Sequence, residues 1–420
     1  MSSSPNIVLE YAEAAQVVLE HGRAISQENR TLESVSLVES VPSVLDRILA
    51  EPVTADRDQP PFPRSTRDGF ACRAADLDPA RPLRIIGQLR SGEFWSGPPL
   101  KAGEAIEIMT GAPVPDGPDC VIMIEHVAIE GGFVRPAGNR MWTAGENIVP
   151  QGAEARAGDT LLAPGTRIQP QHIAIAAACG RESLNVYTRP RVAILATGDE
   201  LVSIGQTPLP HQIRNSNSYS LAAQVIRSGG EPVILAPAPD RLSSIQDSIR
   251  HAQACDLILL SGGVSMGKYD FVEQALANLG AEFFFTGARI QPGKPVVFGR
   301  MPAAKGYRYF FGLPGNPVST MVTFALFAAP ILGFLAGRSP EACSPDFRRA
   351  RLDTPIEAKT GLTRFLPARS TSAIDGVRTK LRPWQGSGDI AAAGESNCFI
   401  VVPDKTQSLA VGDDVTLLYL

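Results

Sequence analysis

The sequence has few of the residues from which metal clusters and disulfide frameworks are built. It contains six cysteines and five histidines in 420 residues. The cysteines form no C-x-x-C pair and the histidines no H-E-x-x-H motif. This dispersed spacing argues against a zinc knuckle and a disulfide-stapled scaffold, and it fits a reducing compartment. We therefore expect a cytoplasmic protein whose histidines are surface or packing residues.

The chain also lacks an excess of positive charge. Its 39 basic and 43 acidic residues give a formal net charge of −4, which argues against nucleic acid or an anionic membrane as a partner. The first apolar stretch carries Glu10 and Glu13 and follows no basic segment, so we do not expect a signal peptide. Residues 318–336 are uncharged and long enough to span a bilayer. Their serine, threonine and proline content favours a buried core helix instead.

The chain is long, and its residue pattern changes several times along its length. At 420 residues it is too long to fold around a single hydrophobic core, so two to four domains are expected. Residues 7–50 show helical amphipathic spacing, and short apolar runs then alternate with Gly/Pro turns up to about residue 149. Helical spacing returns over 150–185. From residue 191 strands and helices alternate, which predicts a parallel or mixed sheet with helices on both faces. Residues 346–420 are typical of a small all-β module.

The most informative segment is 256–270. An apolar run, typical of a buried strand, breaks at Ser261-Gly262-Gly263, and a helical pattern begins after Asp270. Bare backbone N–H groups and a helix start favour an anion such as phosphate. Glycines at 262, 263 and 267 let the main chain approach a ligand closely. The alternative is an ordinary glycine-rich turn between strand and helix.

A second segment repeats this order of strand, Gly/Pro turn and helix. Within Gly312–Ser319, Asn316 is a natural N-cap and Pro317 suits the first helical position. Two helix starts able to bind anions suggest an elongated, multiply charged ligand. The loop Thr197–Glu200 follows the first strand of the same region, so it belongs at the same sheet edge.

These segments belong to a larger set of six motifs. The set comprises Arg67-Asp68-Gly69-Phe70-Ala71, Ile108-Met109-Thr110-Gly111-Ala112-Pro113, Thr197-Gly198-Asp199-Glu200-Leu201, Ser261-Gly262-Gly263-Val264-Ser265, Pro292-Gly293-Lys294-Pro295 and Gly312-Leu313-Pro314-Gly315-Asn316-Pro317-Val318-Ser319. With these motifs in this order, the chain closely resembles the molybdopterin molybdenumtransferase family, the MoeA proteins and the E domain of gephyrin, over nearly its whole length.

The resemblance implies an elongated α/β multidomain homodimer. Its parts would be a helical/extended linker and dimerisation domain (1–50 plus 150–185), a β-rich insertion domain (51–149), an α/β molybdopterin-binding domain (186–338) and a C-terminal β barrel (339–420). The family inserts molybdate into adenylylated molybdopterin and releases AMP, assisted by Mg²⁺. Candidate partners are molybdopterin adenylyltransferase and molybdoenzyme maturation factors.

The resemblance also implies roles for individual residues. Glu200, Asp240 and Asp270 would hold Mg²⁺, although Asp240 is equally well placed as a plain helix N-cap. Lys294 would give a point charge to phosphate or molybdate, the alternative being a solvated loop lysine. Asp68 and Thr110 would complete the site across the dimer. The remaining candidates for substrate binding are Ser261, Gly262, Gly263, Ser265, Gly267, Pro314, Gly315, Asn316, Pro317, Arg369 and Ser387.

Four positions depart from the usual family pattern. Arg64 and Arg67 add positive charge beside Asp68, Gln291 stands where a lysine is common, and Glu154 replaces an aspartate. These changes would tune the choice between molybdate and tungstate or mark a less active paralogue. Two other functions remain open from sequence. One is adenylyl transfer to molybdopterin, although such enzymes usually lack the insertion domain and the barrel. The other is a non-catalytic scaffold like gephyrin.

Overall fold

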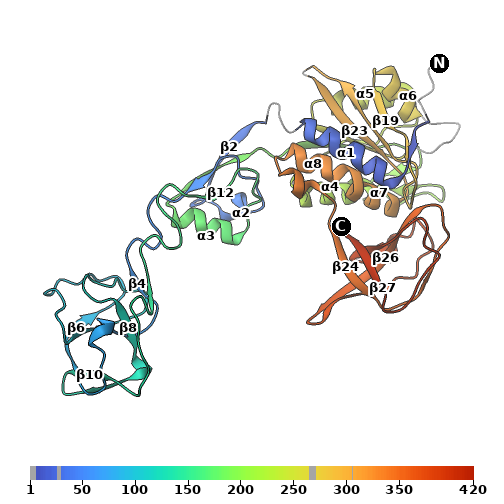
Figure 1. Cartoon of the computed structure of the whole chain (residues 1–420). Helices are drawn as coiled ribbons and strands as arrows, with labels where there is room; N and C mark the ends of the chain where they lie inside the picture. The colour runs from blue at the N-terminus through green and yellow to red at the C-terminus, as the bar shows by residue number, and fades with distance from the viewer. Residues whose placement is uncertain (1–5, 26–29, 264–270, 305) are drawn as a thin grey trace. The chain divides into compact units, whose positions relative to one another are not determined.

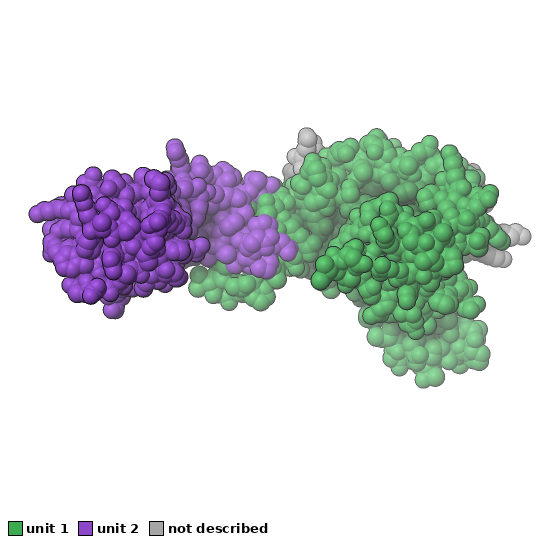
Figure 2. All heavy atoms as spheres, turned by 60° about the horizontal axis from the view of Figure 1, so that its bottom comes forward, with its two compact units in different colours: residues 1–50, 165–168, 183–420 green, residues 51–164, 169–182 purple. Residues whose placement is uncertain are grey.

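The computed structural model describes residues 6–25, 30–263, 271–304 and 306–420. Contacts divide the chain into two units (Figure 2), the first comprising 1–50, 165–168 and 183–420 and the second 51–164 and 169–182. The four-domain division expected from the sequence is finer than this and stays a prediction.

The first unit is built around a six-stranded sheet. Its order is β17 (Glu231–Ile234), β14 (Arg191–Ala196), β18 (Leu257–Ser261), β23 (Tyr307–Leu313), β22 (Val297–Pro302) and β19 (Glu282–Phe285). The first four strands are parallel, and β22 and β19 continue the sheet in antiparallel pairs. The predicted mixed sheet is therefore confirmed, with strands close to the expected positions.

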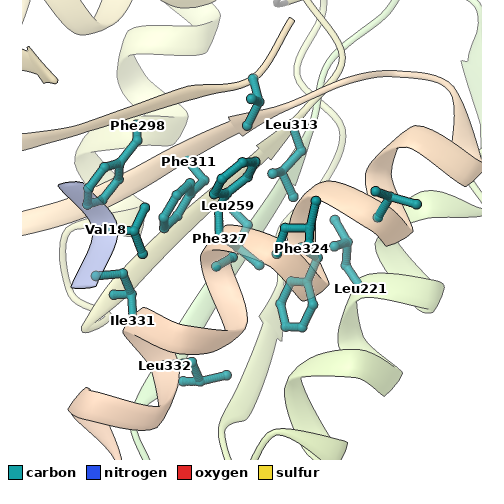
Figure 3. Packing of buried hydrophobic residues seen from close by; sticks show 14 of the residues in the cluster. Val18, Leu221, Leu259, Phe298, Phe311, Leu313, Phe324, Phe327, Ile331 and Leu332 are labelled. Atoms are coloured by element: carbon teal, nitrogen blue, oxygen red, sulfur yellow. The ribbon is translucent and has the colours of Figure 1, made fainter. Parts of the chain in front are cut away.

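Helices cover both faces of this sheet, as predicted (Figure 1). One face carries α1 (Tyr11–Ile25), α4 (Asn217–Arg227), α7 (Pro317–Thr323) and α8 (Ala329–Leu335). The other carries α5 (Leu242–Ala252) and α6 (Phe271–Asn278). In the core of the first face Phe298 and Phe311 stack with ring centroids 4.5 Å apart, and Phe327 and Ile331 from the α7–α8 segment lie against them (Figure 3). This burial fixes the sheet whose edge holds the site.

The apolar segment near residue 318 is a core helix, as expected. Residues 317–335 form one continuous helix in which a π-helical turn, Phe324–Ala328, joins α7 to α8. Pro330 lacks an N–H and cannot extend a regular α-helical ladder, which accounts for the irregular turn just before it. In the described residues this is the one helix apolar enough to cross a membrane, and 78% of its most apolar window is buried.

The C-terminal part of this unit is a closed β barrel. Strands β26 (Thr363–Ala373), β27 (Gly376–Leu381), β24 (Phe347–Leu352), β30 (Asp414–Tyr419) and β28 (Cys398–Val402) pair in that order. An additional pairing of β26 with β28 closes the ring. Strand β21 (Ile290–Gln291) pairs with β26 and so joins the barrel to the segment before β22. The helix α9 (Ile390–Gly394) lies between β27 and β28.

The expected helical character of residues 7–50 is only partly right. Helix α1 and the short α2 (Val41–Val44) are helical, but β2 (Leu32–Ser36) is a strand paired with β13 (Ser183–Tyr187). Three of the five residues in β2 are exposed, so backbone pairing and not a buried face holds it. Helical spacing was therefore misleading there. The N-terminal β1 (Val8–Leu9) pairs with β20 (Gly287–Ala288), and β15 (Leu201–Val202) with β16 (Ile213–Arg214).

The second unit is β-rich, as the Gly/Pro punctuation predicts. Its six-stranded sheet has the order β8 (Cys120–Met123), β5 (Gly69–Cys72), β7 (Glu104–Ile108), β6 (Leu83–Leu89), β10 (Phe133–Pro136) and β9 (Val127–Glu130). Phe70 and Ala71 point to different apolar clusters, so both sheet faces are covered. Shorter pairs join β3 (Val53–Thr54) to β12 (Thr160–Leu162) and β4 (Arg64–Ser65) to β11 (Ile148–Val149). Within 150–185, where helical spacing was predicted, the helix is α3 (Pro170–Ala178).

Candidate active site

Three parallel strands of the first unit end side by side. Ser261, the last residue of β18, pairs with Ala196 of β14 on one side and Leu313 of β23 on the other. The loops that follow these strands therefore leave the sheet at one edge, where ligands of α/β proteins bind. Strand β22 runs antiparallel to β23, so the loop that precedes it, Pro292–Pro295, reaches the same edge.

These loops and a barrel segment line an open pocket of about 660 Å³, within the size range of small-molecule sites. Its walls bring together many of the residues predicted from sequence: Glu200, Asp240, Gly262, Gly263, Lys294, Pro314, Gly315, Asn316 and Ser387. Ser261 and Pro317 flank lining residues in the chain. Arg369 does not line the pocket and donates a hydrogen bond to the carbonyl oxygen of Glu395 (3.4 Å). Ser265, Gly267 and Asp270 lie outside the described residues.

Close backbone approach at this edge requires glycine at two positions. A Cβ at residue 262 would lie 2.6 Å from the carbonyl oxygen of Thr197, and Gly262 has a φ of +94°. At residue 198 a Cβ would lie 2.5 Å from the Glu200 carboxylate. The ends of β14 and β18 therefore pack main chain against main chain, and the Glu200 side chain folds back over Gly198. The predicted close approach of the Gly262 backbone to a ligand stays a prediction.

The acidic residues at this edge are coupled to each other. The Asp199 carboxylate accepts a hydrogen bond from the backbone N–H of Asp240 (3.1 Å), and the Asp240 carboxylate accepts one from the backbone N–H of Asp199. Burial, and then the charges of Asp199 and Glu200, raise the pKa of Asp240, against the opposing effect of the Asp199 N–H. The negative charges of Asp199, Glu200 and Asp240 are thus held close together, and their mutual repulsion is unfavourable without a ligand that offsets it.

The sequence left open whether Asp240 is an ordinary helix N-cap, and the structure shows that it is not. The N-cap of α5 is Arg241, whose side chain makes no capping hydrogen bond. The carboxylate of Asp240 instead faces the loop after β14. Among the described residues no group of three or more His, Cys, Asp and Glu side chains is arranged to hold a metal ion. The third predicted ligand, Asp270, is outside that set.

Asn316 is the N-cap residue of α7, as predicted, but its side chain makes no capping hydrogen bond. Its Nδ2 donates instead to the Oγ of Ser387 (2.8 Å). The backbone N–H of Val318 donates to the carbonyl oxygen of Ser387 (3.1 Å). The first free amide of this helix is therefore bound to the barrel loop, and α7 offers less to an anion than the sequence suggested. The tertiary contact with a segment 71 residues away takes precedence over local capping.

Lys294 is the only positively charged residue among the described residues that line the pocket. It is exposed, and its neighbour Gly293 has a φ of +105° with a Cβ position 2.5 Å from Cγ2 of Thr323. The loop is therefore held tightly on the long helix while the lysine side chain reaches solvent. Two carboxylates and one ammonium group would leave the pocket acidic, so a polyanionic ligand requires a further cation.

Comparison with known proteins agrees with this architecture. Family models for the MoeA N-terminal region (domain I and II), a probable molybdopterin binding domain and the MoeA C-terminal region (domain IV) match residues 9–180, 193–333 and 349–420. The molybdopterin molybdenumtransferase of Synechococcus elongatus is 35% identical and covers 97% of this chain and 99% of its own length. The chain belongs to the MoeA family.

Other MoeA-type proteins match over similar lengths. The molybdopterin molybdenumtransferase of Bacillus subtilis is 33% identical, with 90% of this chain and 88% of that protein covered. The crystal structure of a molybdopterin biosynthesis MoeA protein from Pyrococcus horikoshii is similar with a TM-score of 0.79 and 27% identity. That match covers 98% of this chain and 100% of the other.

Two predicted site residues lie in the second unit, within the part matched to the MoeA N-terminal region. Oδ1 of Asp68 accepts hydrogen bonds from the backbone N–H (2.7 Å) and the hydroxyl (2.9 Å) of Thr110. These bonds, the backbone one first, lower the pKa of Asp68. The structure therefore brings Asp68 and Thr110 together as one exposed, ionised group. Their role across a dimer stays a prediction.

Two of the departures from the usual MoeA pattern compensate each other. Arg64 donates to the carboxylate of Glu154 at 2.6 Å, so the added positive charge meets the altered acidic position. Arg67 is exposed and forms no ion pair with any described residue. Of the two arginines beside Asp68, Arg67 is thus the one whose charge is available to an oxyanion.

Sequence reasoning missed Asn217, which ties two predicted loops together. Its Nδ2 donates to the Oγ of Ser261 (3.0 Å) and to the carbonyl oxygen of Gly315 (2.7 Å). It therefore links the end of β18 to the loop after β23. The available signal was an asparagine at the first position of a predicted helix, directly before an apolar face. Sequence reasoning also missed Trp384 and Leu362 of the barrel, which line the pocket.

Proposed function

We propose that this chain transfers molybdenum from molybdate to adenylylated molybdopterin, with release of AMP. The observation that carries the proposal is the single pocket in which strand-end glycines, Lys294 and the carboxylates of Glu200 and Asp240 meet a loop of the barrel. The Synechococcus elongatus relative, which carries the name molybdopterin molybdenumtransferase, matches along 97% of this chain. The barrel's share in the pocket disfavours adenylyl transfer, since that activity usually occurs without this module.

Each wall of the pocket has a role in this reaction. The glycine loops after β18 and β23 bring backbone close to the phosphates of an elongated substrate. Lys294 supplies a point charge for molybdate or phosphate. Molybdenum forms bonds to the two dithiolene sulfurs of the pterin, and one molybdate oxygen leaves as water with the two thiol protons. Hydrolysis of the phosphoanhydride bond releases AMP and leaves the phosphate on the pterin product.

The charge of the pocket fits a divalent cation. Glu200 and Asp240 both line it, and the Thr197 hydroxyl is buried there with no hydrogen-bond partner among the described residues. Oxygen donors of this kind suit Mg²⁺. These carboxylates, with Asp270 as the third predicted ligand, would hold the ion. When bound, Mg²⁺ neutralises phosphate charge that the carboxylates would otherwise repel.

The assembly and location proposed here follow from family membership. We infer a cytoplasmic homodimer in which Asp68 and Thr110 of one subunit serve the pocket of the other. Molybdopterin adenylyltransferase would supply the substrate, and maturation factors of molybdoenzymes would receive the product. Mixed dimers made from Asp68→Ala and Glu200→Gln chains would test the sharing of sites. They should retain about half of the wild-type sites if Asp68 acts across the dimer.

The activity is tested by AMP release from adenylylated molybdopterin. Wild-type protein with Mg²⁺ should release AMP only when molybdate is present. Lys294→Ala should require a higher molybdate concentration, whereas Lys380→Ala, an exposed lysine that does not line the pocket, should not. Absence of AMP release at saturating molybdate would overturn the proposal. Adenylylation of free molybdopterin by ATP would instead establish the alternative enzyme. If a cell deficient in cofactor synthesis produces as much cofactor with Glu200→Gln as with the wild-type chain, a scaffold role would be favoured.

A further inference from the structure

The pocket has two chemically different walls. The wall from the α/β sheet edge includes glycines, two carboxylates and Lys294, whereas the lining contributed by the barrel includes Leu362 and Trp384. The first wall suits phosphates and a cation. Apolar and aromatic side chains do nothing for those groups, but they favour a flat ring. The pocket is thus divided between a part for charge and a part for an apolar surface.

Trp384 is held as a fixed surface and not as a loose loop side chain. It is half-buried, and it packs against the core cluster that contains Phe365 and Phe399 of the barrel. The same residue lines the cavity. One part of the indole is therefore supported by this core cluster, which extends from the sheet into the barrel, while another part faces the ligand space. A supported ring loses little conformational entropy when a ligand packs on it.

The chain on both sides of Trp384 is anchored. On one side the backbone N–H of Arg382 donates to the carbonyl oxygen of Pro367 (2.9 Å). On the other, the carboxylate of Asp389 accepts from the backbone N–H of Gln385 (2.9 Å). Ser387 then receives the two hydrogen bonds from Asn316 and Val318 described above. The loop is therefore bound to the barrel and to the start of α7, which fixes the distance between the two walls.

We propose that Trp384 is the platform on which a flat nitrogen heterocycle of the substrate stacks, with Leu362 completing the apolar wall. This rests on the proposed function, because adenylylated molybdopterin carries two such rings, the pterin and the adenine, at a distance from its phosphates. Stacking on an indole face is favourable for either ring. The two sources of this chemistry are separated by the choice of probe.

The binding test uses the full chain and two probes, AMP and pterin-6-carboxylate, titrated calorimetrically. Trp384→Leu keeps an apolar side chain but removes the aromatic face, and Trp384→Phe restores one. Phe94→Leu is the matched control, because Phe94 is an aromatic residue of the second unit with 76% of its surface exposed. We expect Trp384→Leu to weaken one probe by about tenfold or more, Trp384→Phe to stay within about threefold, and Phe94→Leu to match wild type. The weakened probe identifies the ring.

A second readout reports the contact directly. The chain has three tryptophans, so replacing Trp95 and Trp142 by phenylalanine leaves Trp384 as the only indole. The probe that depends on Trp384 should quench its fluorescence on binding. Affinities unchanged in Trp384→Leu, or lowered equally in Trp384→Phe, would overturn the inference, as would failure of wild-type protein to bind either probe. Molybdate-dependent AMP release by wild type, measured in parallel, shows whether the proposed function itself stands.

Discussion

Replacing Asn217 should loosen the site edge without unfolding the sheet. Its side-chain amide makes two hydrogen bonds, at 3.0 Å to Ser261 and 2.7 Å to the carbonyl oxygen of Gly315. A net value of about 0.5–1.5 kcal/mol for each bond makes Asn217→Ala cost about 1–2 kcal/mol locally, since water can reach this half-buried position. That corresponds to roughly a 5- to 30-fold change in the opening equilibrium.

Native-state hydrogen exchange measures that opening at the place where it occurs. Peptides covering 257–263 and 309–316 should exchange about 5- to 30-fold faster in Asn217→Ala, while peptides of the second unit should not change. AMP release should show a raised KM for the substrate with a smaller change in kcat, because the loops are displaced and no reacting group is lost.

Two variants sharpen this experiment. Ser216→Ala is the matched control, because Ser216 is exposed at the N-cap of α4 and its side chain makes no capping bond. Asn217→Asp keeps an acceptor for the Ser261 hydroxyl but places a carboxylate against the Gly315 carbonyl oxygen, so the 309–316 peptide should be affected more than 257–263. If Asn217→Ala exchanges like Ser216→Ala in both peptides, the bridging role is wrong.

Further predictions concern charge and close packing. Asp240→Asn should raise the Tm of the ligand-free protein by up to a few degrees, because the pKa of Asp240 is raised in the folded state and its ionisation therefore costs stability above that pKa. The gain should shrink as the pH falls toward the pKa of Asp240, and AMP release should be lost; a lower Tm would contradict this. Gly293→Ala should lower the free energy of unfolding by about 2 kcal/mol or more, from a positive φ and a Cβ 2.5 Å from Thr323, and an unchanged Tm would refute the clash. A double-mutant cycle for Arg64 and Glu154 should give a coupling of about 0.2–1 kcal/mol, and Arg64→Ala should leave the molybdate affinity unchanged. A tenfold loss of molybdate affinity in Arg64→Ala would place that charge on the ligand instead.

The parts of the site that could be predicted from the sequence depend on short local patterns. The buried apolar run before Ser261-Gly262-Gly263 marks the end of a strand, and the ends of parallel strands meet at one edge of the sheet. The parts that were not predicted depend on contacts between distant segments. Neither the loop of Ser387 on α7 nor the pairing of Arg64 with Glu154 has a local signature, since 71 and 90 residues separate the partners. Strand β2 was missed for the same reason, because its partner β13 lies far along the chain.

Electrostatics separates a binding site from an ordinary turn at this sheet edge. An N-cap aspartate gains stability from the helix amides it accepts, which lowers its pKa. Asp240 behaves in the opposite way, since burial and two neighbouring carboxylates raise its pKa. The reciprocal bonds between Asp199 and Asp240 hold these charges together instead of letting them separate. A cation bound in this pocket would offset these charges and, together with Lys294 and the bare glycine backbone, would bind a polyanion. The proposed Mg²⁺ should therefore raise the Tm of wild-type protein and lose that effect in Asp240→Asn.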